Sequence, residues 1–391
     1  MEIHALELHN FRNYESLTLS FGPGVNVLYG LNGQGKTNLL EAIYLCTAAR
    51  SHRTARDTDL IHYDSEGYRV KLTFAAPLDS NYQESLEIRY HQHSVPGMPG
   101  KTRERVILHD GMKLGRVADL MGLFHAVMFA PEDLQLIKDG PRERRRFLDI
   151  LISQLSPLYF VDLQRLQTTL AQRNAVLKSL QKQSYQPFMR EHLMTWNEQL
   201  ANVSGRIINE RYQICQQISN VANTFHARIS QDKEDLTVRY RTRSGVRAEM
   251  APEEIAETLL QELHDTMEDD IQRGFTTIGP QRDDIVFRLD GKDLRNYGSQ
   301  GQQRTAVLAL KLSELQIIHD NTGERPVLLL DDVMSELDKH RRQALVDAIT
   351  DCQIFITCTD ADQVAQDLQR ESRNSIRFFE VRQGHVKPAE R

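Results

Sequence analysis

Hydrophobic and polar residues alternate over the first part of the chain, on either side of a polar turn at 10–14. The hydrophobic positions are Leu6, Leu8, Leu17, Leu19 and Phe21. A period of two predicts strands that bury one face, so we expect an antiparallel hairpin lying beside the strand that follows it. That strand, Val25–Tyr29, is a continuous apolar run, as is typical of a strand buried on both faces. Residues 69–74 and 85–90 are predicted as further strands.

Between about residues 141 and 230 the hydrophobic spacing becomes helical. One series places leucines at 163, 166, 170, 177 and 180, and a second repeats every seventh residue at Leu193, Leu200, Ile207, Ile214 and Val221. With a polar break at 181–187, this pattern predicts two long helices packed antiparallel. An ordinary helical bundle explains the periodicity nearly as well. Under either interpretation this block separates two halves of the chain that share one sheet.

A glycine-rich loop follows the strand Val25–Tyr29. Residues 30–37 read Gly-Leu-Asn-Gly-Gln-Gly-Lys-Thr, which is a complete G-x-x-x-x-G-K-[ST] phosphate loop, and a helical segment follows at 38–45. Strand, glycine turn and helix together point backbone N–H groups at phosphate oxygens. We expect the backbone of Gly30, Asn32, Gly33 and Gly35 to surround the phosphates.

The last two residues of the phosphate loop carry its chemistry. Lys36 is predicted to reach the β- and γ-phosphates, and the Thr37 hydroxyl to ligate Mg²⁺. A glycine turn that binds nothing is the alternative, and the Lys-Thr pair after a buried strand disfavours it. The sequence therefore predicts a site for a nucleoside triphosphate with Mg²⁺.

Two carboxylates end a second apolar run near the C-terminus. Residues 326–332 read Pro-Val-Leu-Leu-Leu-Asp-Asp, which predicts a buried parallel strand. Carboxylates at the C-terminal tip of such a strand lie where ligands bind in an open α/β sheet. We expect Asp331 to hold Mg²⁺, and Asp332 to orient or deprotonate the attacking water. Without the phosphate loop, two exposed carboxylates after a core strand would explain this pattern equally well.

A turn rich in small residues, the serine turn (residues 297–304), precedes a predicted helix. It reads Tyr-Gly-Ser-Gln-Gly-Gln-Gln-Arg, so N–H groups and the Ser299 hydroxyl could face an anion. A plain helix start has the same appearance. The order of the segments favours a functional role, because the turn lies between the helical insertion and the double-Asp strand.

Composition narrows the class of protein. The 391 residues suffice for two or three domains, and 40% hydrophobic with 26% charged residues is ordinary for a globular chain. No apolar run reaches the roughly 20 residues that span a bilayer, the N-terminus lacks a signal-peptide layout, and the 4 cysteines form no C-x-x-C pair. We expect a cytoplasmic protein without a membrane partner.

The net charge of −6 means that any nucleic-acid contact must come from local basic clusters. The candidate phosphate-binding residues are Arg142, Arg144, Arg145, Arg239, Arg241 and Arg243. The last three alternate along residues 236–243 and are expected to share one face of a strand. A solvated face, or ion pairs within the chain, explains each cluster about equally well. No aromatic-rich surface accompanies them, which disfavours sequence-specific reading of single strands.

Taken together, these motifs resemble a known family. They are residues 10–14 (Asn-Phe-Arg-Asn-Tyr), the phosphate loop, 129–134 (Phe-Ala-Pro-Glu-Asp-Leu), 140–149 (starting Gly-Pro-Arg-Glu-Arg-Arg-Arg), 279–284 (Gly-Pro-Gln-Arg-Asp-Asp), the serine turn and 328–338. The chain resembles ATP-binding-cassette (ABC) heads of the structural-maintenance-of-chromosomes (SMC) and Rad50 type, and most closely the RecF family of bacterial recombination mediators, over nearly its whole length. The resemblance implies an α/β, ABC-type P-loop ATPase head with a mixed sheet, built from residues 1–135 and 271–391. A helical arm would be inserted at 136–270.

Such a head implies an ATP site divided between two copies of the chain. The phosphate loop of one copy would face Ser299, Gly301 and Gln302 of the other, with Arg12 and Asn13 also contacting the nucleotide, so that ATP holds a homodimer together. Glu132 and Thr359 stand where a lid glutamine and a switch histidine are usual, which suggests a slow, DNA-stimulated ATPase.

The resemblance also implies a role and partners. The ATP-bound dimer would clamp double-stranded DNA beside single-strand gaps and help to load a recombinase during DNA repair and replication. RecR-like mediator proteins would be its protein partners.

Three other classes of protein carry related motifs. A transporter ATPase shares the head but needs membrane partners, and a chromosome-organising protein has a far longer coiled coil with a hinge. A phosphotransferase would use the same loop on a small molecule, but it offers no reason for the serine turn.

Overall fold

The computed structural model describes residues 1–54, 56–75, 82–94, 101–182, 187–231, 233–349, 352–362, 365 and 375–389. The chain divides into two compact units. The head unit is Met1–Leu134 with Val307–Arg391, and the arm unit is Gln135–Ala306. Of the predicted polar break at 181–187, residues 183–186 lie outside the described residues. Within the described part of the chain, no helix is long and apolar enough to cross a membrane.

A mixed six-stranded sheet forms the centre of the head unit. In spatial order its strands are β15 (His385–Ala389), β14 (Ile376–Arg382), β3 (Val25–Tyr29), β13 (Ile354–Cys358), β12 (Val327–Asp331) and β8 (Ala126–Phe129). Neighbouring strands are parallel except for β14 and β15. The sheet contains β3 and β8 from the N-terminal half and β12 to β15 from the C-terminal half, which confirms that the two halves share it. Val327 to Leu330 of β12 have no exposed surface, as their apolar run predicts.

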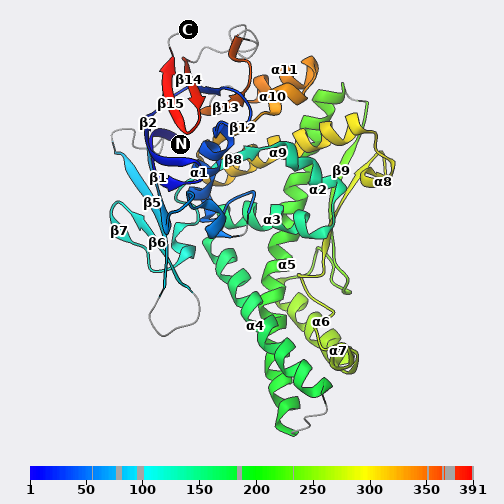
Figure 1. The fold of residues 1–391 in the computed structure, drawn as a ribbon. Coiled ribbons are helices and arrows are strands. Elements are labelled where there is room, and N and C mark those ends of the chain that lie inside the picture. Colours follow the sequence, from blue (N-terminus) through cyan, green and yellow to red (C-terminus); the bar gives the residue numbers. More distant parts are fainter. Residues whose placement is uncertain are drawn as a thin grey trace. The chain divides into compact units, whose positions relative to one another are not determined.

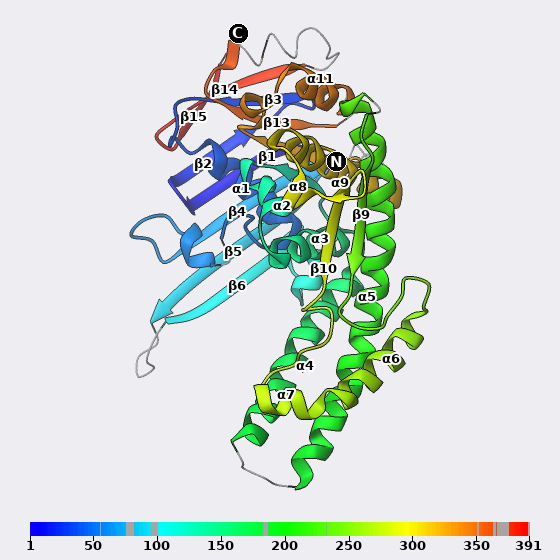
Figure 2. The ribbon, with the colours of Figure 1, turned by 90° about the vertical axis from the view of Figure 1, so that its right-hand side faces the viewer.

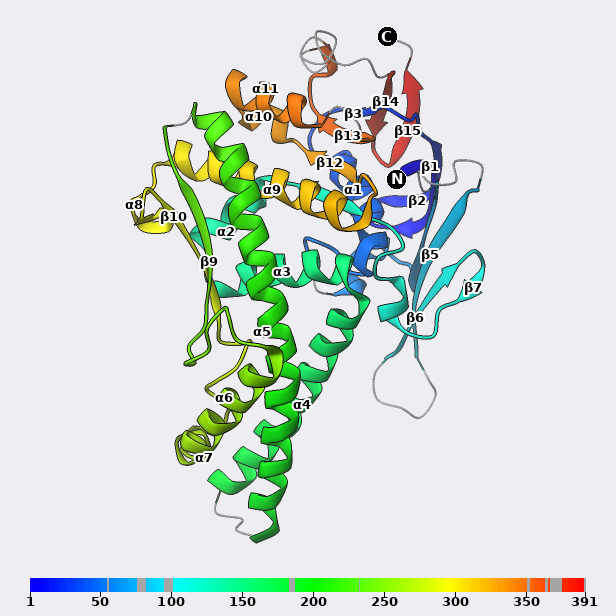
Figure 3. The same cartoon turned by 180° about the vertical axis from the view of Figure 1, so that it is seen from behind.

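A second, antiparallel sheet of the head unit holds the N-terminal hairpin. Its strands, in spatial order, are β2 (Tyr14–Ser20), β1 (Glu2–Phe11), β4 (Gly67–Ala75), β5 (Glu84–Ser94), β6 (Lys101–His109) and β7 (Met112–Lys113) (Figure 3). The hairpin is formed as predicted, with Leu6 opposite Leu19 and Leu8 opposite Leu17. The expectation that it lies beside β3 is wrong as far as pairing goes, because β1 pairs with β4 instead.

The helices of the head unit lie on either side of β12 in the sequence, apart from α1, which follows β3. They are α1 (Lys36–Ala48), the C-terminal part of α9 (Gln300–Thr322), α10 (Val333–Glu336) and α11 (Lys339–Ala348), with 3-10 turns at Asp57–Leu60, Val117–Leu120 and Pro131–Leu134. Helix α1 begins directly after the phosphate loop, as predicted. Nearly all of its residues are buried, since it packs against strands of both sheets.

The arm unit is built on two long antiparallel helices, which the heptad spacing predicts. They are α4 (Pro157–Gln181) and α5 (Pro187–Ser230), and they run side by side (Figure 1). The remaining helices of the unit are α2 (Gln135–Lys138), α3 (Pro141–Leu155), α6 (Pro252–Asp265), α7 (Met267–Arg273), α8 (Leu294–Tyr297) and the first turns of α9.

A three-stranded sheet completes the arm unit, in the order β11 (Lys292–Asp293), β10 (Asp284–Leu289) and β9 (Leu236–Arg241). Figure 2 shows β9 running along α5. Because β10 pairs with β9, residues 271–306 group with the arm, although the sequence assigned them to the head. The compact units change from arm to head at 306/307, whereas the sequence predicts a domain boundary at 270/271.

Candidate nucleotide-binding site and serine turn

The phosphate loop connects β3 to α1 in the head unit, with the strand–turn–helix geometry that the sequence predicts. Gly30 has a φ of 154°, and a Cβ on it would lie 2.3 Å from the carbonyl oxygen of Val381 on β14. Glycine is therefore required there by close packing. Asn32 and Gly33, whose backbone is predicted to surround the phosphates, are exposed.

Lys36 folds back across this loop. Its Nζ donates to the carbonyl oxygens of Gly30 at 2.7 Å and Leu31 at 3.0 Å. Burial lowers the pKa of the ammonium, while the charges of Asp332 and Asp331 partly offset that effect. A phosphate would offer this buried cation stronger acceptors than two neutral carbonyls.

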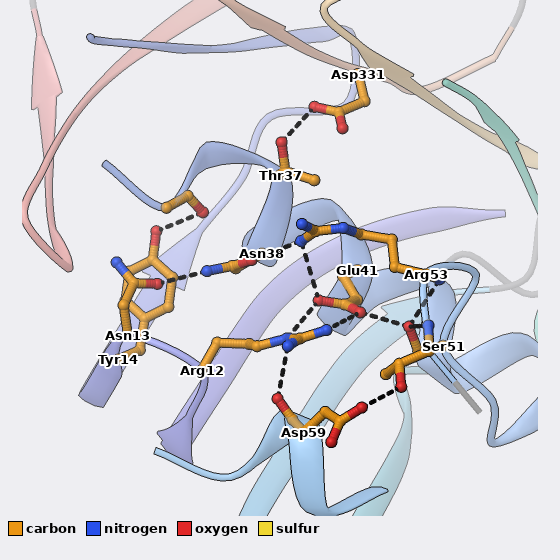
Figure 4. Close-up of polar contacts among 12 residues, drawn as sticks. Arg12, Asn13, Tyr14, Thr37, Asn38, Glu41, Ser51, Arg53, Asp59 and Asp331 are labelled. Atoms are coloured by element: carbon orange, nitrogen blue, oxygen red, sulfur yellow. Dashed lines mark hydrogen bonds and ion pairs between the residues drawn. The ribbon is translucent and has the colours of Figure 1, made fainter. Parts of the chain in front are cut away.

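The hairpin turn between β1 and β2 supports the phosphate loop from one side. Asn13 Nδ2 donates to the carbonyl oxygen of Gln34 at 3.0 Å. The Tyr14 hydroxyl donates to the carbonyl oxygen of Gly35 at 3.0 Å (Figure 4). A Cβ on Gly35 would lie 2.5 Å from Asn13 Nδ2. Asn13, predicted to contact the nucleotide, thus holds the backbone of the loop in this structure.

Arg12, from the same hairpin turn, binds α1 and the turn at Asp59 instead of the phosphate loop. Its guanidinium forms two hydrogen bonds with Glu41 on α1, at 2.8 and 2.7 Å, and a third with the carbonyl oxygen of Asp59 at 2.6 Å (Figure 4). Burial alone would raise the pKa of Glu41, but hydrogen bonds from Arg12 and Ser51 hold it below its ordinary value. In this structure Arg12 thus joins α1 to the turn at Asp59, and its contact with a nucleotide stays a prediction.

The two predicted magnesium ligands meet as the sequence predicts. Thr37 Oγ1 donates to Asp331 Oδ1 at 2.8 Å, across 294 residues of sequence (Figure 4). A hydroxyl and a carboxylate oxygen side by side are ligands that suit Mg²⁺, which prefers oxygen. Burial raises the pKa of Asp331, and the hydroxyls of Thr357 and Thr37 lower it in part.

Thr357 is a site residue that sequence reasoning missed. It lies opposite Asp331 in the parallel pairing of β12 and β13. Its hydroxyl donates to Asp331 Oδ1 at 2.7 Å and accepts the N–H of Asp332 at 2.9 Å. Its place at the end of a second apolar run, 354–358, is the signal that could have shown it.

Asp332 occupies the first position after β12, with a left-handed φ of 53°. Its side chain is half-buried, and Ser335 Oγ donates to its carbonyl oxygen at 2.7 Å and to Oδ1 at 3.2 Å. Glu132 and Thr359, which replace the usual lid glutamine and switch histidine, are both exposed.

The serine turn lies in the arm unit and caps α9. Ser299 Oγ accepts the N–H of Gln302 at 3.2 Å, and Gln302 Oε1 accepts the N–H of Ser299 at 2.8 Å. This reciprocal pair is a capping box. Ser299 is exposed, whereas Gly301 and Gln302 are half-buried, and the carbonyl of Gly301 accepts the Thr305 hydroxyl at 3.0 Å.

The basic residues predicted to bind DNA divide into buried and exposed groups. Arg144 is only 4% exposed, forms an ion pair with Asp284 at 2.7 Å and donates to the carbonyl of Asp139. Its predicted contact with DNA is therefore wrong for this conformation, because burial hides the guanidinium from a phosphate. Arg145 donates to the carbonyl of Asp283 at 2.7 Å and is half-buried, whereas Arg142 is exposed.

The strand β9 presents its basic residues as predicted, with one correction. Val238 and Tyr240 are buried, and Arg239 and Arg241 are exposed on the opposite face. Arg243 is also exposed but lies beyond the end of β9 at Arg241, so it does not belong to that strand face. Arg288 on β10 is opposite Thr237 and exposed, and adds a basic residue that the sequence did not suggest.

A parallel-stranded core that carries a phosphate loop after β3 and carboxylates after β12, joined to a serine-turn helix, defines an ABC-type ATPase head. A family model described as the RecF/RecN/SMC N-terminal domain matches residues 2–387. The DNA replication and repair protein RecF of Symbiobacterium thermophilum is 42% identical over 390 residues, which are 99% of this chain and 98% of that relative. The RecF of Bacillus subtilis is 39% identical over 378 residues, which are 95% and 97% of the two chains. The chain belongs to the RecF family.

Solved structures agree with this assignment. The structure of the recombination mediator protein RecF with ATP, in the RecFOR pathway, is 35% identical and has a TM-score of 0.88, covering 100% of this chain and 98% of that one. An SMC head domain derived from Pyrococcus furiosus is 16% identical with a TM-score of 0.52, and covers 99% of this chain and 96% of its own. The latter shares the fold alone. The predicted resemblance to RecF and the predicted fold class are confirmed.

Proposed function

We propose that the chain is an ATP-dependent DNA-binding protein of recombinational repair and replication. It would bind ATP with Mg²⁺ at the phosphate loop and hydrolyse it slowly, with stimulation by DNA. The observation that carries this proposal is the hydrogen bond between Thr37 and Asp331, which brings the loop and the double-Asp strand to one point. Lys36 would bind the phosphates, Thr37 and Asp331 the metal ion, and Asp332 the attacking water.

The second half of the reaction site would come from another copy of the chain. Ser299 is exposed, and its oxygen already accepts a hydrogen bond from Gln302 N–H, so its own proton remains available for an acceptor such as a γ-phosphate oxygen. Gly301 and Gln302 would complete this surface. Residues 1–135 and 271–391 would act together as the ATPase head in this proposal, and 136–270 as the arm. ATP would then stabilise a homodimer, and hydrolysis would release it.

Double-stranded DNA, held next to a single-strand gap, is the proposed ligand of this dimer. The exposed arginines of β9 and β10 support this part of the proposal, because they can neutralise backbone phosphates without reading bases. The dimer would assist recombinase loading together with RecR-like mediator proteins, in line with the names of the relatives.

A mixing experiment tests the shared site. Lys36→Ala removes the phosphate-binding cation and should abolish nucleotide binding, and Ser299→Arg should block the opposing surface. Each variant alone should be inactive, but a mixture forms some dimers with one intact pair of surfaces and should recover ATPase activity. Asp332→Asn should retain ATP and accumulate the dimer. A mixture as inactive as its components would contradict a site shared between copies.

A further inference from the structure

A chain of hydrogen bonds joins helix α5 to the serine turn within the arm unit. His226 on α5 has no exposed surface, and its Nε2 lies 3.0 Å from Glu234 Oε2. The other carboxylate oxygen of Glu234, Oε1, accepts the side-chain N–H of Gln302 at 2.8 Å. Glu234 thereby bridges the end of a long arm helix and a residue of the serine turn.

The bridge continues from Gln302 to Ser299. With its amide nitrogen held by Glu234, the Gln302 side chain turns its Oε1 toward the N–H of Ser299, at 2.8 Å. The backbone N–H of Gln302 in turn donates to Ser299 Oγ at 3.2 Å. The first contact holds the backbone of Ser299 and the second restrains its Oγ, and neither contact uses the hydroxyl proton of the serine.

The residues next to Glu234 are anchored on two sides. Asp235 N–H donates to Asp290 Oδ1 at 2.9 Å, and Asp290 N–H donates back to the carbonyl of Asp235 at 2.9 Å. Leu236 N–H donates to Asn223 Oδ1 on α5 at 2.9 Å. A carboxylate on such a fixed backbone holds its partner in one place at a smaller cost in conformational entropy than a mobile side chain would.

We propose that Glu234, anchored by His226, is a positioning residue that acts through Gln302 to orient the Ser299 hydroxyl toward the γ-phosphate of ATP bound to a second copy. This inference rests on the proposed function for the role of Ser299. The bond from Gln302 to Glu234 has an ionised acceptor, which makes it stronger than a neutral amide pair. A displacement of His226 at the end of α5 would therefore change the orientation of Ser299, because Glu234 and Gln302 connect the two residues.

The first test examines the turn itself, without nucleotide. In Glu234→Ala, amide hydrogen exchange of residues 299–304 should increase by about tenfold, the size expected from losing a hydrogen bond to a charged group. Glu262→Ala is a matched control, because Glu262 also accepts a loop N–H in the arm unit, from Gly245. Among the residues that the structure describes, Glu262 forms no hydrogen bond with the serine turn. Exchange of residues 299–304 in the control should stay at the wild-type rate.

The second test measures ATP-driven association. ATP binding by the separate Glu234→Ala chain should change less than about twofold, whereas the protein concentration for half-maximal association should rise about tenfold or more. Glu234→Gln keeps an oxygen that can accept from Gln302, and His226 can adopt the tautomer that accepts at Nε2, so this variant should recover much of the loss. A double-mutant cycle with Gln302→Ala should be strongly non-additive, because both residues act on the same serine.

The outcomes separate this inference from the proposed function. Unchanged exchange in Glu234→Ala, or effects of Glu234→Ala and Gln302→Ala that simply add, would overturn the positioning role. If the wild-type chain failed to associate with ATP, the proposed shared site would fail, and the exchange measurement would still decide whether Glu234 orders the turn.

Discussion

The orientation of the Asp331 carboxylate depends on two hydroxyl groups, one from the phosphate loop and one from the neighbouring strand. Thr357→Val keeps the shape of the side chain and removes the second hydroxyl, which also accepts the N–H of Asp332. We expect the Mg²⁺ concentration needed for ATP binding to rise about tenfold, because a buried carboxylate loses a hydrogen bond. Titration of ATP binding with Mg²⁺ measures this, and binding in the presence of a chelator should not change.

The ion pair between Arg12 and Glu41 is expected to matter for stability. Arg12→Gln leaves the fully buried Glu41 with weaker compensation, and should lower the free energy of unfolding by about 3 kcal/mol at neutral pH. The pKa of Glu41 is held below its ordinary value, so its contribution to stability is present above that value and is lost as the pH falls through the lowered pKa.

The difference in stability between the wild-type chain and Arg12→Gln should accordingly shrink toward acid pH. Denaturant unfolding at neutral and acid pH measures it. The double variant Arg12→Gln with Glu41→Gln removes both charges and should recover part of the loss. A constant difference at all pH values would contradict the assignment of the effect to this pair.

At this scale the sequence predicted the residues that a local motif contains, and missed those that only the fold brings together. Lys36, Thr37 and Asp331 come from recognisable patterns. Thr357 and Glu41 carry no motif, since their importance comes from partners in other strands and turns. Arg144 was assigned to DNA because its neighbours are basic, and the sequence does not show that Asp284 pairs with it.

At the scale of elements, helix α5 covers the open edge of strand β9 with side chains. Asn223 Oδ1 accepts Leu236 N–H at 2.9 Å, and Ser219 Oγ, one helical turn away, accepts Val238 N–H at 3.0 Å. The spacing of one helical turn matches that of two strand residues, so alternate N–H groups of the strand are satisfied.

Asn223→Ala should remove the hydrogen bond that the Leu236 N–H on the edge of β9 donates to α5. We expect a loss of about 1 to 2 kcal/mol in unfolding free energy, because a backbone donor loses its partner, and faster amide exchange at Leu236. Asn220→Ala on the same helix is the control, since Asn220 is exposed and its side chain accepts only from Gln216 among the bonds described. Equal effects of the two substitutions would argue against the role of α5 in holding the strand.

The outward face of β9 and β10 is where we expect DNA contact. Arg239→Glu with Arg241→Glu should weaken binding to duplex DNA at moderate salt and leave ATP binding intact. Removing two phosphate contacts should also reduce the slope of log affinity against log salt by about 2. Arg165→Glu on α4, also exposed, serves as the control, and DNA affinity that is unchanged by the double substitution would exclude this face.

The elements themselves were largely predictable. The positions of β3, α1, β12 and the two arm helices follow from apolar runs, the glycine loop and heptads. Sheet membership did not follow, because the pairing of β1 with β4 and of β10 with β9 depends on residues far apart in the sequence. The sequence therefore predicts the hairpin beside β3, and it does not show that 284–289 pairs with β9.

At the scale of the whole molecule, one chain carries one phosphate loop and one serine turn, each in a different compact unit. The net charge of −6 opposes non-specific binding to DNA, so affinity for DNA should depend on local arginines and on the number of copies that bind together. A complete ATP site and strong binding to DNA are therefore both expected to require association of the chain with a second copy.

Sedimentation of the wild-type chain at a series of protein concentrations, with and without ATP and Mg²⁺, tests that claim most directly. We predict a monomer–dimer equilibrium that ATP shifts toward the dimer and that gapped duplex DNA shifts further. Lys36→Ala should abolish the shift caused by ATP. A folded chain that stays monomeric with ATP bound, and hydrolyses it at a rate per molecule independent of protein concentration, would contradict this prediction.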